Sequence, residues 1–204
     1  MSHVYVVIRL LLCLVGLAAF AATACAQAPA VSPTENINWP SPDGKFAFLT
    51  SYGEDLHSID LIEQKSGKKL QRIGEEDSNA TWRVRWAPDS NRFALMTRLG
   101  HPIQGADVYF RSGETFEKID LPDLPEADIP EKLTHGKKFT HIASQNWQEA
   151  REWKKDGSLV VTVDTMIDGE GSSITATRTV VLDFDQAGKA RIVKSTIEYE
   201  TKRD

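Results

Sequence analysis

The sequence predicts an all-β protein of three four-stranded antiparallel sheets in an open or distorted stack, with a short helical or loop insertion between the second and third. The first observation behind this is an internal repeat, in which a Trp, an Asp-centred turn and an apolar strand recur. The second is the alternation of apolar and polar residues between turns, which is typical of half-buried strands. The third is composition: 204 residues, 41% hydrophobic and 26% charged, suffice for one substantial core.

Residues 1–26 predict an export signal. Arg9 supplies a positive charge before an apolar run rich in Leu, Val and Ala, and this run ends in Ala24-Cys25-Ala26. Signal peptidase accepts small residues in this pattern, so that cleavage after Ala26 makes Gln27 the new N-terminus. We therefore expect the mature protein in the periplasm of a bacterium, or secreted.

Two other interpretations of this stretch stay open. In a lipoprotein, Cys25 is lipidated and anchors the protein to the envelope, although Ala22 is smaller than the aliphatic residue usual three places before such a Cys. In a retained membrane anchor, the apolar run would span the bilayer, but it is short against the roughly 20 residues of a spanning helix. We expect no transmembrane span after processing, and a flexible N-terminal tether at residues 27–36.

Cysteine usage constrains the mature domain. Cys13 and Cys25 are the only cysteines of the chain, and both lie in or beside the signal. The mature domain is therefore expected to have no disulfide, no Cys nucleophile and no Cys-based metal site, although it enters an oxidising compartment. Its stability must come from the burial of apolar surface.

The repeat organises residues 37–204 into one domain. The segment that begins at Trp39 recurs at Trp86, and a divergent third copy begins at Trp153. The expected repeats span about 37–78, 81–121 and 147–199, with an insertion at 122–146. The residues that define the repeats are Trp39, Pro42, Asp43, Gly44, Trp86, Pro88, Asp89, Trp153, Asp156 and Gly157.

Each Asp-centred element predicts a tight turn between two strands. Pro presets φ, the Asp side chain accepts a hydrogen bond from the backbone two residues on, and Gly permits a positive φ. In the second copy, which lacks the Gly, we expect Asn91 to take the left-handed conformation. The expected strands are Phe46–Ser51, Ser58–Gln64, Lys68–Ile73, Thr81–Trp86, Arg92–Thr97, Ala106–Phe110, Thr115–Leu121, Leu159–Thr165, Ile174–Phe184 and Ala190–Tyr199.

The recurring string Trp-x-Pro-Asp-x-x-x-Phe-Ala-(Phe/Leu) resembles the β-propeller repeats of the TolB type, which are WD-like. The resemblance covers residues 38–121 well and 147–199 only in part. It implies four-stranded propeller-like blades but no particular activity, because propellers host many functions. It also implies core positions between blades for Trp39, Phe46, Phe48, Trp86, Phe93, Leu95, Trp153, Leu159 and Val161.

Three blades are fewer than the roughly four to eight of a closed propeller. We expect an open stack in a single chain, with closure by oligomerisation and a β-sandwich as the alternatives. An open stack leaves edge strands that need cover. The insertion at 122–145 and the polar tail Glu198–Asp204 are the candidate covers, and Glu131–Ala143 predicts a short helix within the insertion.

Chemistry-bearing motifs are missing from the sequence. It has no G-x-S-x-G, H-E-x-x-H, P-loop or G-x-G-x-x-G motif, so we predict no catalytic residues and no cofactor. The histidines of the mature chain are His57, His101, His135 and His141; His135 and His141 are six residues apart, which is not the spacing of two metal ligands on one helix face, and are expected in a solvated loop. Weak Ca²⁺ candidates lie in or near an expected hairpin loop at 166–173, and they are Asp164, Asp168 and Glu170.

Charge and the lack of catalytic motifs limit the function. A net charge of −5 argues against nucleic acid as a partner. We therefore expect an exported, non-enzymatic module that binds a protein or a cell-envelope component through blade loops and strand edges. The alternative is a small secreted hydrolase or accessory subunit, with a site formed by the insertion at 122–146 and the loop at 166–173.

Overall fold

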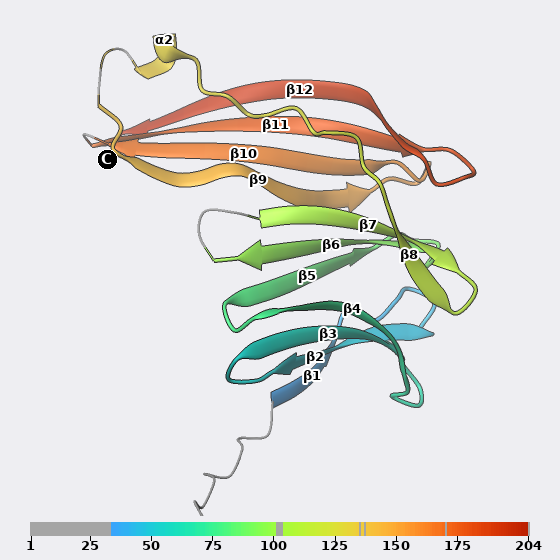
Figure 1. Cartoon of the computed structure of the whole chain (residues 1–204). Coiled ribbons are helices and arrows are strands. Elements are labelled where there is room, and N and C mark those ends of the chain that lie inside the picture. The colour runs from blue at the N-terminus through green and yellow to red at the C-terminus, as the bar shows by residue number, and fades with distance from the viewer. Residues whose placement is uncertain (1–33, 101–103, 135, 137, 170, 204) are drawn as a thin grey trace, which may run out of the picture. The chain divides into compact units, whose positions relative to one another are not determined.

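The computed structural model describes residues 34–203 apart from 101–103, 135, 137 and 170, and they form three four-stranded antiparallel sheets (Figure 1). The first sheet contains β1 (Thr34–Asn38), β2 (Phe46–Tyr52), β3 (Leu56–Glu63) and β4 (Lys69–Asp77). The second contains β5 (Ala80–Trp86), β6 (Arg92–Leu99), β7 (Gln104–Ser112) and β8 (Thr115–Ile119). The third contains β9 (His141–Trp153), β10 (Leu159–Gly169), β11 (Ser172–Phe184) and β12 (Ala190–Arg203). Strands follow chain order within each sheet, which confirms the predicted fold class.

The expected signal and its processing positions, Cys25, Ala26 and Gln27, lie outside the described residues. The expected tether at 27–36 overlaps the first sheet, because β1 begins at Thr34 and pairs with β2. In the part of the chain that the structure describes, no helix is long and apolar enough to cross a membrane.

Asp-centred turns join the first two strands of each sheet. The Asp43 carboxylate accepts a hydrogen bond from the backbone N–H two residues on at 3.1 Å, and Asp156 does the same at 3.0 Å. Gly44 and Gly157 follow these residues with φ of +71° and +87°, a region that costs an L-residue energy. The predicted turn chemistry is therefore present in the first and third copies.

In the second copy the prediction for Asn91 was wrong. The positive φ falls on Ser90, at +58°, one residue earlier. Ser90 is buried, and its hydroxyl accepts a hydrogen bond from the backbone N–H of Asp43 at 3.0 Å. This bond to the first sheet fixes a conformation that local propensity does not favour.

The second sheet packs on both faces. Along β6, Phe93 and Leu95 face the first sheet, while Ala94 and Met96 face the third. The core between the first and second sheets is aromatic, and its buried members include Phe46, Phe48, Trp82, Phe93, Tyr109 and Phe116. The core between the second and third sheets is mainly aliphatic, and its buried members include Met96, Val108, Trp153, Leu159, Val161, Val180 and Leu182. Within the described residues the first and third sheets share no core cluster, so the sheets do not close into a ring.

Indole hydrogen bonds repeat between neighbouring sheets. Trp86 Nε1 donates to the Trp39 carbonyl oxygen at 2.9 Å, which ties the second sheet to the first. Trp153 Nε1 donates to the Arg85 carbonyl oxygen, also at 2.9 Å, which ties the third sheet to the second. The repeated Trp is thus both a core side chain and an inter-sheet donor.

The third sheet is longer than the sequence predicted. β9 begins at His141 rather than near residue 147, and β10 and β11 extend until only residues 170 and 171 separate them. The expected loop at 166–173 is therefore largely strand. The sequence predicts shorter strands here because polar and Gly residues have a low β propensity. In the structure, pairing with a long neighbouring strand holds these residues in register.

The insertion covers a sheet face rather than an edge. Ala127 is fully buried against Val163 and Ala176, on the same face of the third sheet that packs on the second. The Glu126 carbonyl oxygen accepts a hydrogen bond from Arg178 Nε at 2.7 Å. Figure 1 shows this segment, in yellow, running across the long strands.

Two further predictions about covering elements need correction. The helix α2 spans only Glu131–Thr134, and the residues from His141 that we expected to continue it belong to β9. The tail that begins at Glu198 does not cover an edge strand, because it is part of the edge strand β12.

Candidate functional site

The repeat residues lie in the framework of the fold. Trp39, Trp86 and Trp153 follow or end the first strand of their sheets and pack into the two inter-sheet cores. Asp89 accepts hydrogen bonds from the Asn91 N–H at 3.0 Å and from Arg92 Nη2 at 2.8 Å. These residues build turns and cores, and a ligand site has to be sought elsewhere.

The weak Ca²⁺ candidates are not brought together. Asp164 and Asp168 both lie on β10, four positions and therefore about 13 Å apart along the strand, too far to share an ion. Asp164 lies 3.5 Å from Arg151 Nη2, and Asp168 lies 3.5 Å from His141 Nδ1. Glu170 lies outside the described residues. Among those that are described, no group of three or more His, Cys, Asp or Glu is placed to hold a metal ion.

The histidines and the buried tyrosine show no catalytic arrangement. His57 Nδ1 lies 2.9 Å from the Ala80 carbonyl oxygen, which anchors the ring to β5, while His101 and His135 lie outside the described residues. Burial, with a smaller contribution from Asp107, raises the pKa of Tyr109 to about 12. The Tyr109 hydroxyl therefore stays neutral, and its ring stacks on Phe93 in the core.

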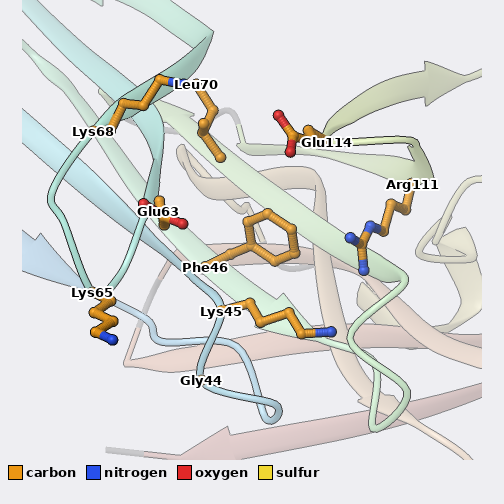
Figure 2. Close-up of a pocket in the computed structure, with 9 residues that line it drawn as sticks. All are labelled: Gly44, Lys45, Phe46, Glu63, Lys65, Lys68, Leu70, Arg111 and Glu114. Carbon is orange, nitrogen blue, oxygen red and sulfur yellow. The ribbon is translucent and has the colours of Figure 1, made fainter.

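A groove of about 340 Å³ opens between the first and second sheets, at the end where the hairpin turns lie. Its floor is the buried ring of Phe46 with the partly buried Leu70 beside it. Figure 2 shows Phe46 at the centre of the groove, with Arg111 approaching from the β7–β8 hairpin and Lys45 from the first sheet. The groove is lined by Gly44, Lys45, Phe46, Glu63, Lys65, Lys68, Leu70, Arg111 and Glu114.

The rim of this groove is mainly basic. Lys45, Lys65, Lys68 and Arg111 contribute four cationic groups against two carboxylates. Lys45 Nζ lies 3.5 Å from the Asp43 carboxylate, while no ion pair involves Lys65 or Lys68 within the described residues. The groove therefore carries an excess of positive charge in a protein whose net charge is −5.

Arg111 is held in place by contacts that leave part of its charge available. Its Nε donates to the Gly113 carbonyl oxygen at 2.8 Å, and its guanidinium carbon lies 4.9 Å from the centre of the Phe46 ring. A guanidinium stacked on an aromatic ring keeps its edge free for a planar carboxylate. Arg111 is thus a preorganised anion-binding group above an apolar floor.

A second groove, of about 460 Å³, lies on the other side of Arg111, between the second and third sheets. Here Arg92 is engaged: it lies over the Trp153 ring at 5.1 Å, bonds to Asp89 and donates to the Gly157 carbonyl oxygen at 3.0 Å. Arg92 therefore joins the sheets, and the first groove has the more available cations.

The sequence did not single out this groove. Its lysines and Arg111 belong to no recognisable motif, and scattered basic residues of this kind are ordinarily solvated surface. The residues come from the β1–β2 turn with the start of β2, from the β3–β4 hairpin and from the β7–β8 hairpin, and the packing of Phe116 on Phe46 brings the two sheets together here. The offset between the repeats does not indicate which hairpins lie side by side in the folded protein.

Comparisons with known proteins do not show a family for this chain. No family model and no curated protein matches the sequence. Among solved structures, an uncharacterized protein from Listeria monocytogenes EGD-e is similar with a TM-score of 0.33 and 12% identity, over 81% of this chain and 52% of that one. A prolyl endopeptidase structure is similar with a TM-score of 0.32 and 13% identity, over 81% of this chain and 27% of that one. The chain thus spans about half and about a quarter of their lengths, and the resemblance to TolB-type repeats stays a prediction.

Proposed function

We propose that this protein is an exported, non-enzymatic binding module that engages a protein or cell-envelope partner through its blade loops and strand edges. The observation that carries the proposal is the groove between the first and second sheets, where Arg111 and Lys45 stand over the apolar floor of Phe46. An apolar floor with a charged rim is the usual composition of a recognition site.

The groove favours a ligand that combines a carboxylate with an apolar side chain. The ring of Phe46 and the side chain of Leu70 offer apolar contact, and the four cations of the rim offer charge-assisted hydrogen bonds. An acidic segment of a partner protein, with an aromatic or aliphatic residue between carboxylates, meets both requirements.

The binding test compares peptides and charge variants. A fluorescent peptide with Phe between Asp and Glu residues is titrated with the protein, beside a peptide in which Lys replaces each acid. We expect binding of the acidic peptide only, and a fall in affinity with salt, because exposed charges are screened. Lys65→Glu with Lys68→Glu should weaken binding at least tenfold.

The matched control is Lys132→Glu with Lys138→Glu, which reverses two exposed lysines of the insertion, outside the groove. This control should bind the acidic peptide as the wild type does. Equal loss in both double variants, or no binding of the acidic peptide at millimolar protein, would overturn the assignment of the groove.

Export is tested separately, by the N-terminus of the protein made in a bacterium. Cleavage of the expected signal gives a chain that starts at Gln27 and is found in the periplasm or medium, as intact-mass measurement of each fraction will show. A lipidated Cys25 instead gives a heavier, membrane-associated chain. A cytoplasmic chain that retains residues 1–26 would contradict export.

A further inference from the structure

Among the strands that the structure describes, β12 is the longest, and it forms an edge of the third sheet. It spans 14 residues, Ala190–Arg203, and pairs on one side with β11. Within the described residues no strand pairs with its other side, so a row of backbone N–H and C=O groups is open there. Natural edge strands are usually shortened, covered or broken by Pro, and β12 has no Pro.

The open edge of β12 is regular over most of its length. A single bulge places Val193 outside the pairing with β11, and from Lys194 to Arg203 the register is unbroken. Apolar side chains are exposed along the strand, with Val193 52% and Tyr199 42% exposed. Such an edge is suited to the addition of another strand.

The charges in the regular part of β12, from Lys194 on, are complementary to the same strand running in the opposite direction, while Arg191, which would face Arg203, lies beyond the bulge at Val193. With a twofold axis at Ile197, Lys194 of each copy lies opposite Glu200 of the other, and Ile197 lies opposite its own copy. Both side chains of the charged pair lie on one face, because Lys194 pairs with Val181 and Glu200 with Thr175 of β11. Lys194 has no ion pair among the described residues, and Glu200, whose carboxylate lies 3.6 Å from Lys202 Nζ on the same strand, is exposed and can contact a second cation.

Two other centres for the pairing are less favourable, and a third, at Thr196, which places Lys194 opposite Glu198, is distinguished from Ile197 by the Glu200→Lys variant. An axis at Glu198 places Glu198 opposite Glu198 and Lys194 opposite Lys202. An axis at Tyr199 places Glu198 opposite Glu200. Like charges directly opposite one another destabilise a strand pair, so the axis at Ile197 is preferred over both.

We propose that β12 pairs antiparallel with β12 of a second copy of this chain, about a twofold axis at Ile197. The third sheets of the two copies then form one continuous eight-stranded sheet with Lys194–Glu200 pairs on both sides of the axis. The contact is isologous and closes on itself, so it ends at a dimer rather than a fibre.

The test measures self-association of the purified protein by sedimentation at several concentrations. Wild type is expected to be a dimer. Lys194→Glu and Glu200→Lys each place like charges opposite one another twice, and each should weaken the dimer by about tenfold or more. Mixing the two variants restores both charge pairs, so that the mixture should form heterodimers detected by native mass spectrometry. Lys155→Glu, an exposed charge reversal in the turn before β10, is the control.

Three outcomes would overturn the proposal. The first is a wild type that stays monomeric up to millimolar concentration. The second is a dimer that Lys194→Glu weakens no more than Lys155→Glu does. The third is a failure of the mixed variants to associate although each is folded, as unchanged melting temperatures and far-UV circular dichroism will establish. These outcomes test only the pairing of β12, whereas the peptide titration tests the groove at Phe46 independently.

Discussion

At the residue scale, the repeated Trp packs in an inter-sheet core and also donates a hydrogen bond to the neighbouring sheet. A smaller apolar residue could not do both. Trp86 contacts Phe46, Phe48, Phe93 and Phe116 at ring-centre distances of 5.1 to 6.3 Å. Its indole N–H also satisfies a carbonyl of the neighbouring sheet. This combination explains why the repeat keeps Trp at the end of the first strand in the second and third sheets.

Two substitutions of Trp86 separate the contribution of ring packing from that of the indole hydrogen bond. Trp86→Ala removes the ring contacts and leaves a cavity, and should lower the free energy of unfolding by about 3 kcal/mol or more. Trp86→Phe keeps an aromatic ring but leaves the Trp39 carbonyl without its donor, and should cost about 1–2 kcal/mol. Urea unfolding measures both. A cost below about 1 kcal/mol for Trp86→Ala would contradict the position of this side chain in the core.

Gly157 and Gly44 offer a matched comparison of backbone strain. Both have a positive φ, but a Cβ at Gly44 would meet open space, while one at Gly157 would lie 2.8 Å from Arg92 Nη2. Gly44→Ala should cost about 1 kcal/mol, and Gly157→Ala about 1 kcal/mol more.

The excess cost at Gly157 can be traced to Arg92 by a double-mutant cycle. In an Arg92→Ala background, Gly157→Ala should cost no more than Gly44→Ala does, because the clashing guanidinium is gone. An unchanged excess in that background would show that the strain has another source.

At the scale of the element, the turns combine local hydrogen bonds with a defined charge state. The Asp156 carboxylate accepts from the hydroxyl of Ser158 at 2.7 Å and from its backbone N–H, and these bonds lower the pKa of Asp156. Burial acts most strongly on Asp43 and opposes its ionisation, but hydrogen bonds from Ser41 and Lys45 and the Lys45 charge together lower its pKa. The folded state therefore favours the ionised turn carboxylates.

This charge state predicts a pH dependence. A carboxyl whose pKa is lower in the folded state stabilises the fold above its ordinary value of 3.8, and that stabilisation is lost as the pH falls through the folded-state pKa. The stability difference between wild type and Asp156→Asn should therefore shrink as the pH falls below 3.8. Urea unfolding from pH 7 to pH 2.5 measures it, with the exposed Asp55→Asn as the control. A constant difference across this range would be inconsistent with the ionised turn.

The elements of the first two sheets other than β1, part of which was expected to be a tether, could be predicted because their signals are local. Expected strands such as Arg92–Thr97 lie within the observed β6, and both turns carry Pro followed by Asp at fixed positions. The strands of the third sheet were predicted too short. β10 runs through Asp168 and Gly169, which are residues that usually end a strand. Pairing with β11 over an unbroken register outweighs that local tendency.

At the scale of the whole molecule, the second sheet connects the two cores. β6 contributes alternate residues to both cores, so its position depends on the packing of each. The Gln71 side chain of the first sheet also bonds both the N–H and the C=O of Phe116 in the second, each at 2.8 Å. The described sheets should therefore unfold together.

This coupling predicts one cooperative transition. Phe48→Leu in the aromatic core and Val161→Ala in the aliphatic core should each cost about 1–3 kcal/mol and shift the same transition. Tryptophan fluorescence and far-UV circular dichroism should give coincident urea curves for wild type and both variants. Two separate transitions, each sensitive to one variant only, would show that the sheets unfold independently.

The sequence by itself determined the repeat, the turns and the positions of the Trp residues, because each depends on residues near one another in the chain. It also determined the alternation on β5, with Trp82, Val84 and Trp86 on one face and Arg83 and Arg85 on the other. Only the tertiary structure decided what the arginine face meets: Arg85 Nε bonds to the Ala150 carbonyl oxygen of the third sheet at 2.9 Å. Likewise, only the packing of sheets placed Arg111 over Phe46 and left the edge of β12 open, because these relations join residues that no local pattern links.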